Sequence, residues 1–199
     1  KAAPCLDMEK RLPAEGIHSV LVSSGVANAL TGPEGLADVE GICAQLAKEL
    51  NVPPAAVLMA STGVIGLRLP KERILTALPK LAAGLKAIPE LAAEAMLTTD
   101  TRIKMASRVI KLGGKTVTLT AIAKGSGMIA PQLATLIGIV TTDAAISPKL
   151  LQAALAQSMD GSFHNLIIDG DMSTNDVVLG LANGLLPCGL SYALLARAG

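Results

Sequence analysis

The sequence predicts a layered domain of the α/β or α+β class, and three observations carry that prediction. Short β-branched runs alternate with segments whose apolar residues recur every three or four positions, without a regular βαβ repeat. A chain of 199 residues that is 51% hydrophobic suffices for one domain with a sizeable core. With one Phe, one Tyr and no Trp, that core consists of Ala, Leu, Ile, Val and Met.

Strands are predicted where short apolar or β-branched runs end at glycine, proline or hydroxyl residues. Gly113 and Gly114 separate two such runs and predict a hairpin turn. Residues 177–196 carry no charge over the length of a bilayer span, but Gly180 and Pro187 would leave a lone helix poorly supported. We expect two buried elements joined by a turn there. The other predicted strands are 19–23, 57–60, 107–112, 116–123, 135–142 and 166–168.

Helices are predicted where the apolar residues follow helical spacing. Ser147 followed by Pro148 is a favourable N-cap and first-turn pair, which predicts that a helix begins there. Pro79 is expected to interrupt the helix in which it lies. The predicted helices are 36–50, 74–85, 90–97 and 147–159.

Charge and cysteine usage exclude several classes of protein. The net charge of +1 and the scarcity of aromatic residues argue against nucleic-acid binding, and the chain shows no membrane span or secretory signal. Cys5, Cys43 and Cys188 are odd in number and far apart, which disfavours a disulfide framework and fits the cytoplasm. His18 and His164 are also far apart, so no metal site is expected.

Two local motifs resemble known ligand loops and fail on spacing. Residues 114–116 (GKT) end like a phosphate-binding loop, but Val109 stands where its first glycine belongs. Residues 169–173 (DGDMS) begin like a calcium loop, but Thr174 and Gly180 replace the required glycine and glutamate. Neither motif predicts a ligand site.

Three segments rich in small and hydroxylated residues remain. They are ASTGVIG at 60–66, TTDT at 98–101 and KGSGMIAP at 124–131. Taken singly, each is best interpreted as a turn that leads into a core strand. Taken together and in this order, they point to a shared site.

With MLTTDT at 96–101, AKGSGMIAPQLATL at 123–136, TTDA at 141–144 and DGDMSTNDVVLGLANG at 169–184, the chain resembles the ornithine acetyltransferase family. That family, also called bifunctional glutamate N-acetyltransferase, belongs to arginine biosynthesis. The resemblance covers residues 1–184 as a single domain, whereas 185–199 is expected to be an unmatched tail. It implies a layered α/β/β/α sandwich similar to the N-terminal nucleophile type. Family members are expected to extend beyond this chain at both ends.

The resemblance also implies a precursor that cuts itself between Ala134 and Thr135. The α-chain part would then be 1–134, and 135–184 would be the start of the β-chain part. Thr135 becomes an N-terminal residue and the catalytic nucleophile. Its freed α-amino group, with a reference pKa of about 7.7–8.0, can act as base for its own hydroxyl.

Further site residues follow from the same resemblance. Thr62 and Gly63 are expected to form the oxyanion hole, through a hydroxyl and a backbone N–H. Thr98, Lys124 and Thr135 are expected to bind substrate, with the Lys124 ammonium a reasonable partner for a substrate carboxylate. No metal and no cofactor are expected.

The implied activity is acetyl transfer from N-acetylornithine to glutamate through an acetyl-threonine intermediate. Acetyl-CoA is a possible co-substrate in bifunctional members of the family. The α and β chains are expected to assemble as a heterotetramer in the cytoplasm. Two alternatives stay open: an amidohydrolase or aminopeptidase on the same scaffold, and an inactive structural fragment that needs a complementary chain.

Overall fold

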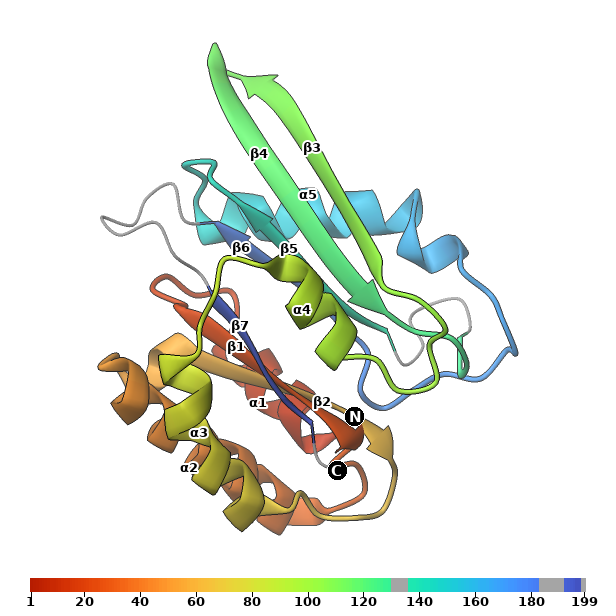
Figure 1. Ribbon diagram of the computed structural model, residues 1–199. Helices are drawn as coiled ribbons and strands as arrows, with labels where there is room; N and C mark the ends of the chain where they lie inside the picture. The colour runs from red at the N-terminus through yellow and green to blue at the C-terminus, as the bar shows by residue number, and fades with distance from the viewer. Residues whose placement is uncertain (130–135, 183–191, 198–199) are drawn as a thin grey trace.

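The computed structural model describes residues 1–129, 136–182 and 192–197, and these residues form two β-sheets (Figure 1). The first sheet is parallel throughout and contains, in spatial order, β2 (Val57–Val64), β1 (Ser19–Val26) and β7 (Tyr192–Arg197). The second is antiparallel except for its last pair and contains, in spatial order, β3 (Lys104–Leu112), β4 (Lys115–Lys124), β5 (Ile137–Thr142) and β6 (Val177–Ala182).

The described helices are α1 (Ala3–Arg11), α2 (Gly32–Leu50), α3 (Lys71–Ala83), α4 (Pro89–Ala95) and α5 (Pro148–Asp160), with 3₁₀ turns at η1 (Pro54–Ala56) and η2 (Phe163–Asn165). Helices α1, α2 and α3 lie on the far side of the first sheet and α5 on the outer face of the second, whereas α4 lies between β7 and the β3–β4 hairpin (Figure 1). The last residue of α2 is followed by Asn51 in the left-handed conformation, which ends the helix.

The two sheets pack face to face through one apolar layer. Side chains alternate between the two faces of a strand, so every second residue of β1 and β2 enters this layer. The opposing sheet contributes isoleucines and leucines from β4, β5 and β6. The strand residues of this inter-sheet core are Val20, Val22, Leu58, Ala60, Ile122, Ile137, Ile139, Leu179 and Leu181.

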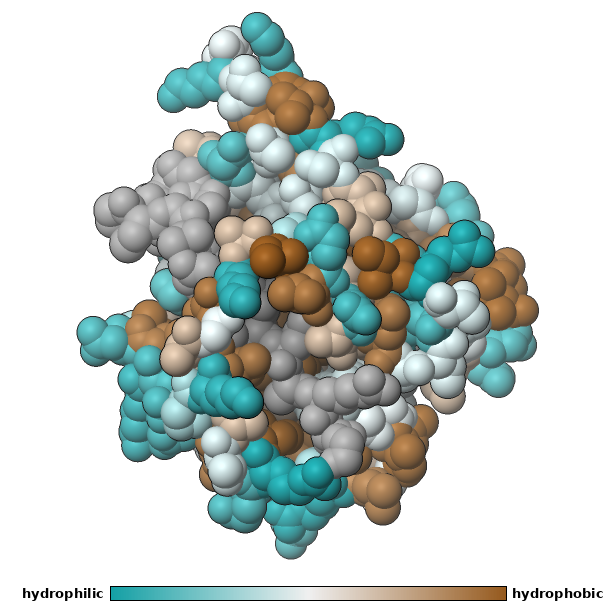
Figure 2. All heavy atoms as spheres, viewed as in Figure 1, coloured by the Kyte–Doolittle hydropathy of each residue, from teal (hydrophilic) through white to brown (hydrophobic). Residues whose placement is uncertain are grey.

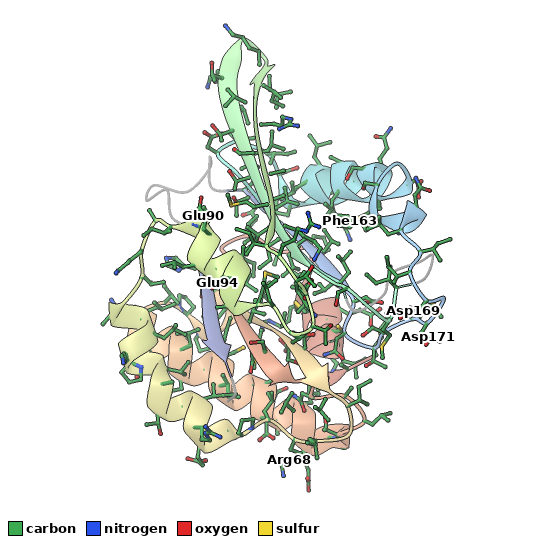
Figure 3. The ribbon with its side chains drawn as sticks, turned by 45° about the vertical axis from the view of Figure 1, so that its right-hand side comes forward. Arg68, Glu90, Glu94, Phe163, Asp169 and Asp171 are labelled. Carbon is green, nitrogen blue, oxygen red and sulfur yellow. The ribbon has the colours of Figure 1, made fainter. Side chains whose placement is uncertain are left out.

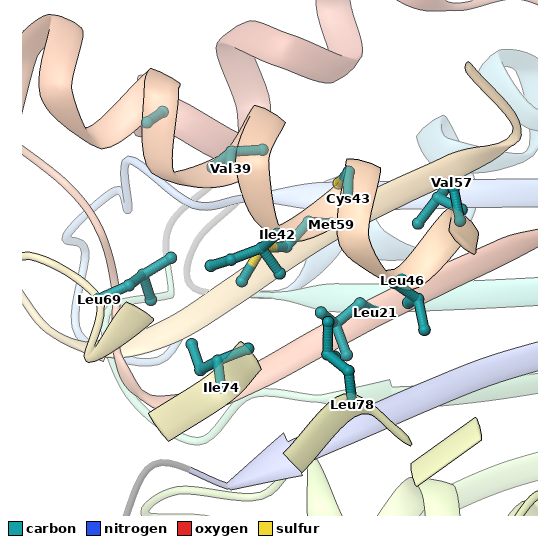
Figure 4. Close-up of a cluster of buried hydrophobic side chains, with 12 residues drawn as sticks. Leu21, Val39, Ile42, Cys43, Leu46, Val57, Met59, Leu69, Ile74 and Leu78 are labelled. Carbon is teal, nitrogen blue, oxygen red and sulfur yellow. The ribbon is translucent and has the colours of Figure 1, made fainter. Parts of the chain in front are cut away.

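The intervening residues of β1 and β2 form a second core against the helices. Leu21 and Met59 are fully buried there (Figure 4). They pack against Ile42 and Leu46 of α2 and against Leu78 of α3. The first sheet is therefore covered on one side by helices and on the other by the second sheet.

Helix α5 covers the outer face of the second sheet. A Cβ placed on Gly180 of β6 would lie 3.3 Å from Leu151 of α5, so helix and strand are in close contact. The order helix, sheet, sheet, helix is the layered α/β/β/α sandwich that the family resemblance implies, and the fold class is confirmed.

Several local predictions are confirmed by backbone geometry. Gly113 and Gly114 both have positive φ, +57° and +78°, and form the two-residue turn between β3 and β4. The Ser147 hydroxyl accepts a hydrogen bond from the Leu150 N–H at 3.4 Å and caps α5. By contrast, the expected interruption at Pro79 is wrong, because α3 continues through this residue to Ala83.

Other local predictions differ from the structure. The strand predicted at 166–168 is wrong, because this segment pairs with no strand among the residues that the structure describes, and Ile167 and Ile168 are 62% and 63% exposed. The Ile168 N–H instead donates to the Ile129 carbonyl. Helix α1 was not predicted. The uncharged stretch 177–196 was predicted to hold two elements rather than one membrane span, and the structure has the two strands β6 and β7 there.

The surface is uneven in polarity. Every residue of β3 is exposed, and the β3–β4 hairpin projects beyond the sandwich (Figure 1). On the face in Figure 2, hydrophobic side chains gather near its middle, around α4, where Ile88 and Leu91 are exposed. Across the described residues, no helix combines the length and apolar character needed to cross a membrane.

Candidate active site

Thr62 and Lys124 reach each other from opposite sheets. Along β2, Leu58 and Ala60 enter the inter-sheet core, so Thr62, two residues further on, points the same way. Along β4, Ile122 enters that core from the other side, and Lys124 follows it by two residues. The apolar layer therefore ends in a polar contact between the two strand ends.

Lys124 holds two threonine hydroxyls together. Its Nζ donates to Thr62 Oγ1 at 3.0 Å and to Thr98 Oγ1 at 2.9 Å, and its side chain is almost completely buried. Thr98 lies just beyond α4, where the Ser24 hydroxyl donates to the Ala95 carbonyl at 2.9 Å. Three residues that the sequence assigned to a site, Thr62, Thr98 and Lys124, thus meet in space.

Asp100 supplies the countercharge and was not predicted. Its buried carboxylate accepts from Lys104 Nζ at 2.6 Å and from the Gly125 N–H at 2.7 Å, and lies 3.8 Å from Lys124 Nζ. Burial raises the pKa of Asp100, but Lys104, the Gly125 N–H and Lys124 together hold that pKa below its usual range. The carboxylate is ionised and balances the buried ammonium. The sequence signal that could have identified Asp100 is its position in the TTDT segment at 98–101.

The Lys124 ammonium keeps the two hydroxyl protons available. Burial lowers the pKa of Lys124, and the nearby Asp100 carboxylate opposes that shift. An ammonium donates and cannot accept, so the oxygens of Thr62 and Thr98 must be the acceptors. Each hydroxyl therefore retains its own proton, which it can donate to a further group.

Gly63 requires glycine for a reason within the sheet. Its φ is +132°, and an added Cβ would lie 2.2 Å from the carbonyl carbon of Gly25, its partner on β1. Gly63 is exposed, whereas Thr62 beside it is fully buried. The site therefore opens towards solvent at Gly63, and the glycine also allows the close approach of two backbones.

The predicted cleavage residues Ala134 and Thr135 lie outside the described residues. The described chain stops at Ile129 and resumes at Leu136. On the first side, the Asp169 carboxylate accepts from the N–H groups of Met128 and Ile129, which hold its pKa below the usual range. Figure 3 labels Asp169 on the loop between α5 and β6.

On the other side, Asp176 and its neighbour Asn175 make the contacts. Asp176 Oδ1 accepts from the Leu136 N–H at 2.9 Å. The buried Asn175 Nδ2 donates to the Ser61 carbonyl at 2.8 Å and to the Ala27 carbonyl at 2.6 Å. Sequence reasoning quoted their motif but gave neither residue a role, because no spacing rule links them to residues 61 or 136.

One cavity lies away from this site. It has a volume of about 560 Å³ and lies between the loop 12–17, α5 and β6, with Leu58 at its floor. Its lining includes none of the expected site residues that the structure describes. Among the described residues, no group of three or more His, Cys, Asp or Glu side chains could hold a metal ion.

Comparison with known proteins identifies the family. The family model described as the ArgJ family matches residues 1–197. This chain belongs to the ArgJ family. The match continues beyond Gly184, where the motifs that carry the resemblance end.

Curated members of the ArgJ family are similar over most of this chain. The arginine biosynthesis bifunctional protein ArgJ of Thermotoga neapolitana is 46% identical over 188 residues, which are 93% of this chain and 47% of that protein. The ArgJ protein of Bacillus subtilis is 46% identical over 174 residues, 84% of this chain and 41% of its own length. The chain thus spans about half the length of the curated relatives it matches.

Two solved ArgJ structures share the fold. The arginine biosynthesis bifunctional protein of Bacillus halodurans aligns with a TM-score of 0.57 and 36% identity, over 66% of this chain and 70% of the solved one. Ornithine acetyltransferase from Mycobacterium tuberculosis, complexed with ornithine, aligns with a TM-score of 0.58 and 31% identity, over 66% and 71%. Because the aligned part is a similar share of both chains, each solved chain is about as long as this chain. Each solved chain is therefore also about half as long as the curated relatives.

Proposed function

We propose that this chain supplies the nucleophile and the oxyanion donors of an enzyme that moves an acetyl group from N-acetylornithine to glutamate. The observation that carries the proposal is the buried Lys124 ammonium shared by the hydroxyls of Thr62 and Thr98. Hydroxyls that accept from a fixed cation and keep their own protons are preorganised to donate to a negative oxygen. The names of the relatives, an arginine biosynthesis protein and an ornithine acetyltransferase, support this chemistry.

The first step is maturation of the chain. The Thr135 hydroxyl attacks the Ala134 carbonyl carbon, the peptide C–N bond breaks, and an ester with a free α-amino group forms. Water then hydrolyses the ester, which leaves the Ala134 carboxylate and the Thr135 hydroxyl. The solved relatives' chains, about half as long as the curated relatives, support such a cut.

Acetyl transfer then proceeds in two halves through the same hydroxyl. The Thr135 oxygen attacks the acetyl carbonyl of N-acetylornithine, its proton passes through the Thr135 α-amino group to the leaving amine, and ornithine departs. The α-amine of glutamate attacks the acetyl ester and the proton returns to Thr135. Each half passes through an oxyanion, to which Thr62 and the Gly63 N–H donate.

Lys124 has a second role in this proposal. Two of its three N–H groups point to hydroxyls, and Asp100 Oδ2 at 3.8 Å is beyond hydrogen-bonding distance. The third N–H can therefore bind a substrate α-carboxylate, with Thr98 beside it. The proposed chemistry needs no cofactor, and acetyl-CoA is a candidate co-substrate, as in bifunctional members of the family. The α and β chains are proposed to form a cytoplasmic heterotetramer.

Intact-mass spectrometry tests the proposal on the purified chain, alone and together with the polypeptide that spans the rest of the relatives' length. We expect fragments 1–134 and 135–199, and, after N-acetylornithine is added, one acetyl group on the fragment that begins at Thr135. Thr135→Ala is expected to stay intact, whereas Thr76→Ala, which removes an exposed hydroxyl on α3, is expected to behave as wild type.

The outcomes separate the alternatives. Cleavage that persists in Thr135→Ala would contradict the assigned nucleophile. Cleavage only in the presence of the second polypeptide identifies this chain as a fragment that needs a complementary chain. An acetyl adduct that is lost to water at the same rate with or without glutamate would identify an amidohydrolase instead.

A further inference from the structure

The dipeptide Asn175–Asp176 contacts both halves of the proposed site. Asn175 is 2% exposed, and its side-chain amide donates to the Ser61 carbonyl, whose carbon is bonded to the Thr62 nitrogen. The Asp176 carboxylate accepts from the Leu136 N–H, whose nitrogen is bonded to the carbonyl carbon of Thr135. Two consecutive side chains thus hold the Ser61 carbonyl, just before the expected oxyanion donor, and the N–H of Leu136, the residue that follows the expected nucleophile in the sequence.

We propose that Asn175 and Asp176 are positioning residues that together set the separation between the end of β2, which carries Thr62, and Leu136, which follows the expected nucleophile in the sequence. The inference rests on the proposed function, and it assigns to this pair no contact with substrate. Asn175 and Asp176 are joined by one peptide bond, so the two strand ends that their side chains contact are kept at a nearly constant separation. Reacting groups tolerate little misplacement, since an error of about 1 Å can cost about 10²-fold in rate.

The first contact is specific in its hydrogen bonding. The Asn175 amide nitrogen offers two donors, and both carbonyls within its reach, Ala27 and Ser61, lie on neighbouring strand ends. The Ser61 hydroxyl donates to the same Ala27 carbonyl. The end of β2 is therefore fastened to β1 immediately before Thr62.

The contact between Asp176 and Leu136 carries an electrostatic cost. Burial raises the pKa of Asp176 to about 6, although the Leu136 N–H and Lys124 both favour the ionised form. The other titratable group that faces Asp176 is Cys5 of α1, whose pKa burial and Asp176 raise to about 11. An aspartate pKa raised in the folded state means that stability is lost as the pH rises through about 4 to 6.

The test compares variants of Asp176 that keep or lose the hydrogen-bond acceptor. Asp176→Asn keeps an oxygen that can accept from Leu136. Asp176→Leu keeps the branching at Cγ, is larger and has no acceptor, and Asp176→Ala takes its place if the leucine variant does not fold. The matched control is Asp171→Asn, an exposed carboxylate in the same segment (Figure 3). The readouts are the self-cleavage rate, kcat and KM for acetyl transfer with the complementary polypeptide present, and the thermal midpoint at pH 5 and pH 8.

For Asp176→Leu we expect kcat and the cleavage rate to fall about 10²-fold while KM stays within about 3-fold, because substrate binding is not touched. Asp176→Asn is expected to keep most of both rates, and its thermal midpoint should exceed that of the wild type at pH 8 more than at pH 5. Asp171→Asn is expected to match the wild type throughout.

A double variant tests whether the pair acts as a unit. Asn175→Ala is expected to lower kcat as Asp176→Leu does, and combining the two should cost little more than the larger single effect. Wild-type rates in both single variants, or equal losses in Asp176→Asn and Asp176→Leu, would overturn the positioning role while leaving the proposed function intact. A wild-type protein that neither cuts itself nor takes up acetyl would refute the proposed function, and this inference with it.

Discussion

Lys124 illustrates how one residue can link stability and chemistry. An ammonium is seldom buried unless it is well paired, and here two hydroxyls and a nearby carboxylate compensate its desolvation. The same contacts orient the hydroxyl of Thr62. Removing that hydroxyl therefore takes a partner from a buried charge as well as a donor from the proposed oxyanion hole, so both stability and rate must be measured.

Thr62→Val and Thr62→Ser separate these two effects. Without the hydroxyl, Thr62→Val is expected to lose about 1–3 kcal/mol of unfolding free energy and about 10²–10³-fold in kcat. Thr62→Ser keeps the hydroxyl and is expected to retain most of the turnover. The measurements are thermal unfolding and single-turnover acetyl transfer, with Thr76→Ala as the control. If Thr62→Val lost stability but kept its turnover, Thr62 would be a structural residue only.

At the scale of elements, the parallel pair β1–β2 carries the site at its carboxyl end. The two strands pair in register from Ser19↔Val57 to Val26↔Val64, and Gly25 lies opposite Gly63. The pair of glycines lets the backbones approach where side chains would collide. The close approach brings the Thr62–Gly63 peptide to the end of the inter-sheet layer, so the shape of the strand pair decides where the donors lie.

Gly63→Ala and Gly66→Ala test this constraint. Both glycines have positive φ, +132° and +88°, but only Gly63 has backbone atoms within 4 Å of the added Cβ. We expect Gly63→Ala to lose about 3 kcal/mol or more, or to fail to fold, and Gly66→Ala to lose about 1 kcal/mol. Chemical denaturation of the two variants makes the comparison. Equal losses would mean that backbone conformation alone, and not the β1 contact, requires glycine.

At the scale of the molecule, the two cores have different consequences for the site. The inter-sheet core sets the separation of the sheets, and Lys124 reaches Thr62 and Thr98 across that separation. The helix-side core stabilises the first sheet from behind and has no direct part in this contact. Loss of packing between the sheets should therefore disturb the site more than an equal loss behind them.

Leu58→Ala and Leu21→Ala are a matched pair for this distinction. Both leucines are fully buried, Leu58 between the sheets and Leu21 against α2 and α3. Each substitution is expected to cost about 2–5 kcal/mol. Leu58→Ala should in addition slow acetyl transfer per folded molecule, measured well below its thermal midpoint, whereas Leu21→Ala should not. The same specific activity in both variants would show that the site does not depend on inter-sheet packing.

The sequence by itself determined the local elements and the family. The glycine pair of the β3–β4 hairpin and the Ser147–Pro148 cap act over a few residues, so their outcomes can be predicted from local chemistry. The resemblance named Thr62, Thr98 and Lys124 from motifs and not from geometry. The strand prediction at 166–168 failed because an apolar run becomes a strand only beside a partner, and no described strand pairs with that segment.

The tertiary structure alone decided which of these residues meet. Lys124 contacts Thr62 across 62 positions of the chain, and the Asn175 amide reaches Ser61 across 114. Such contacts depend on how two sheets stack and on which faces their strands present. Local spacing carries no information about that stacking. Asp100, Asn175 and Asp176 therefore came to light only through the folded molecule, in which burial and hydrogen bonding give each of them a partner.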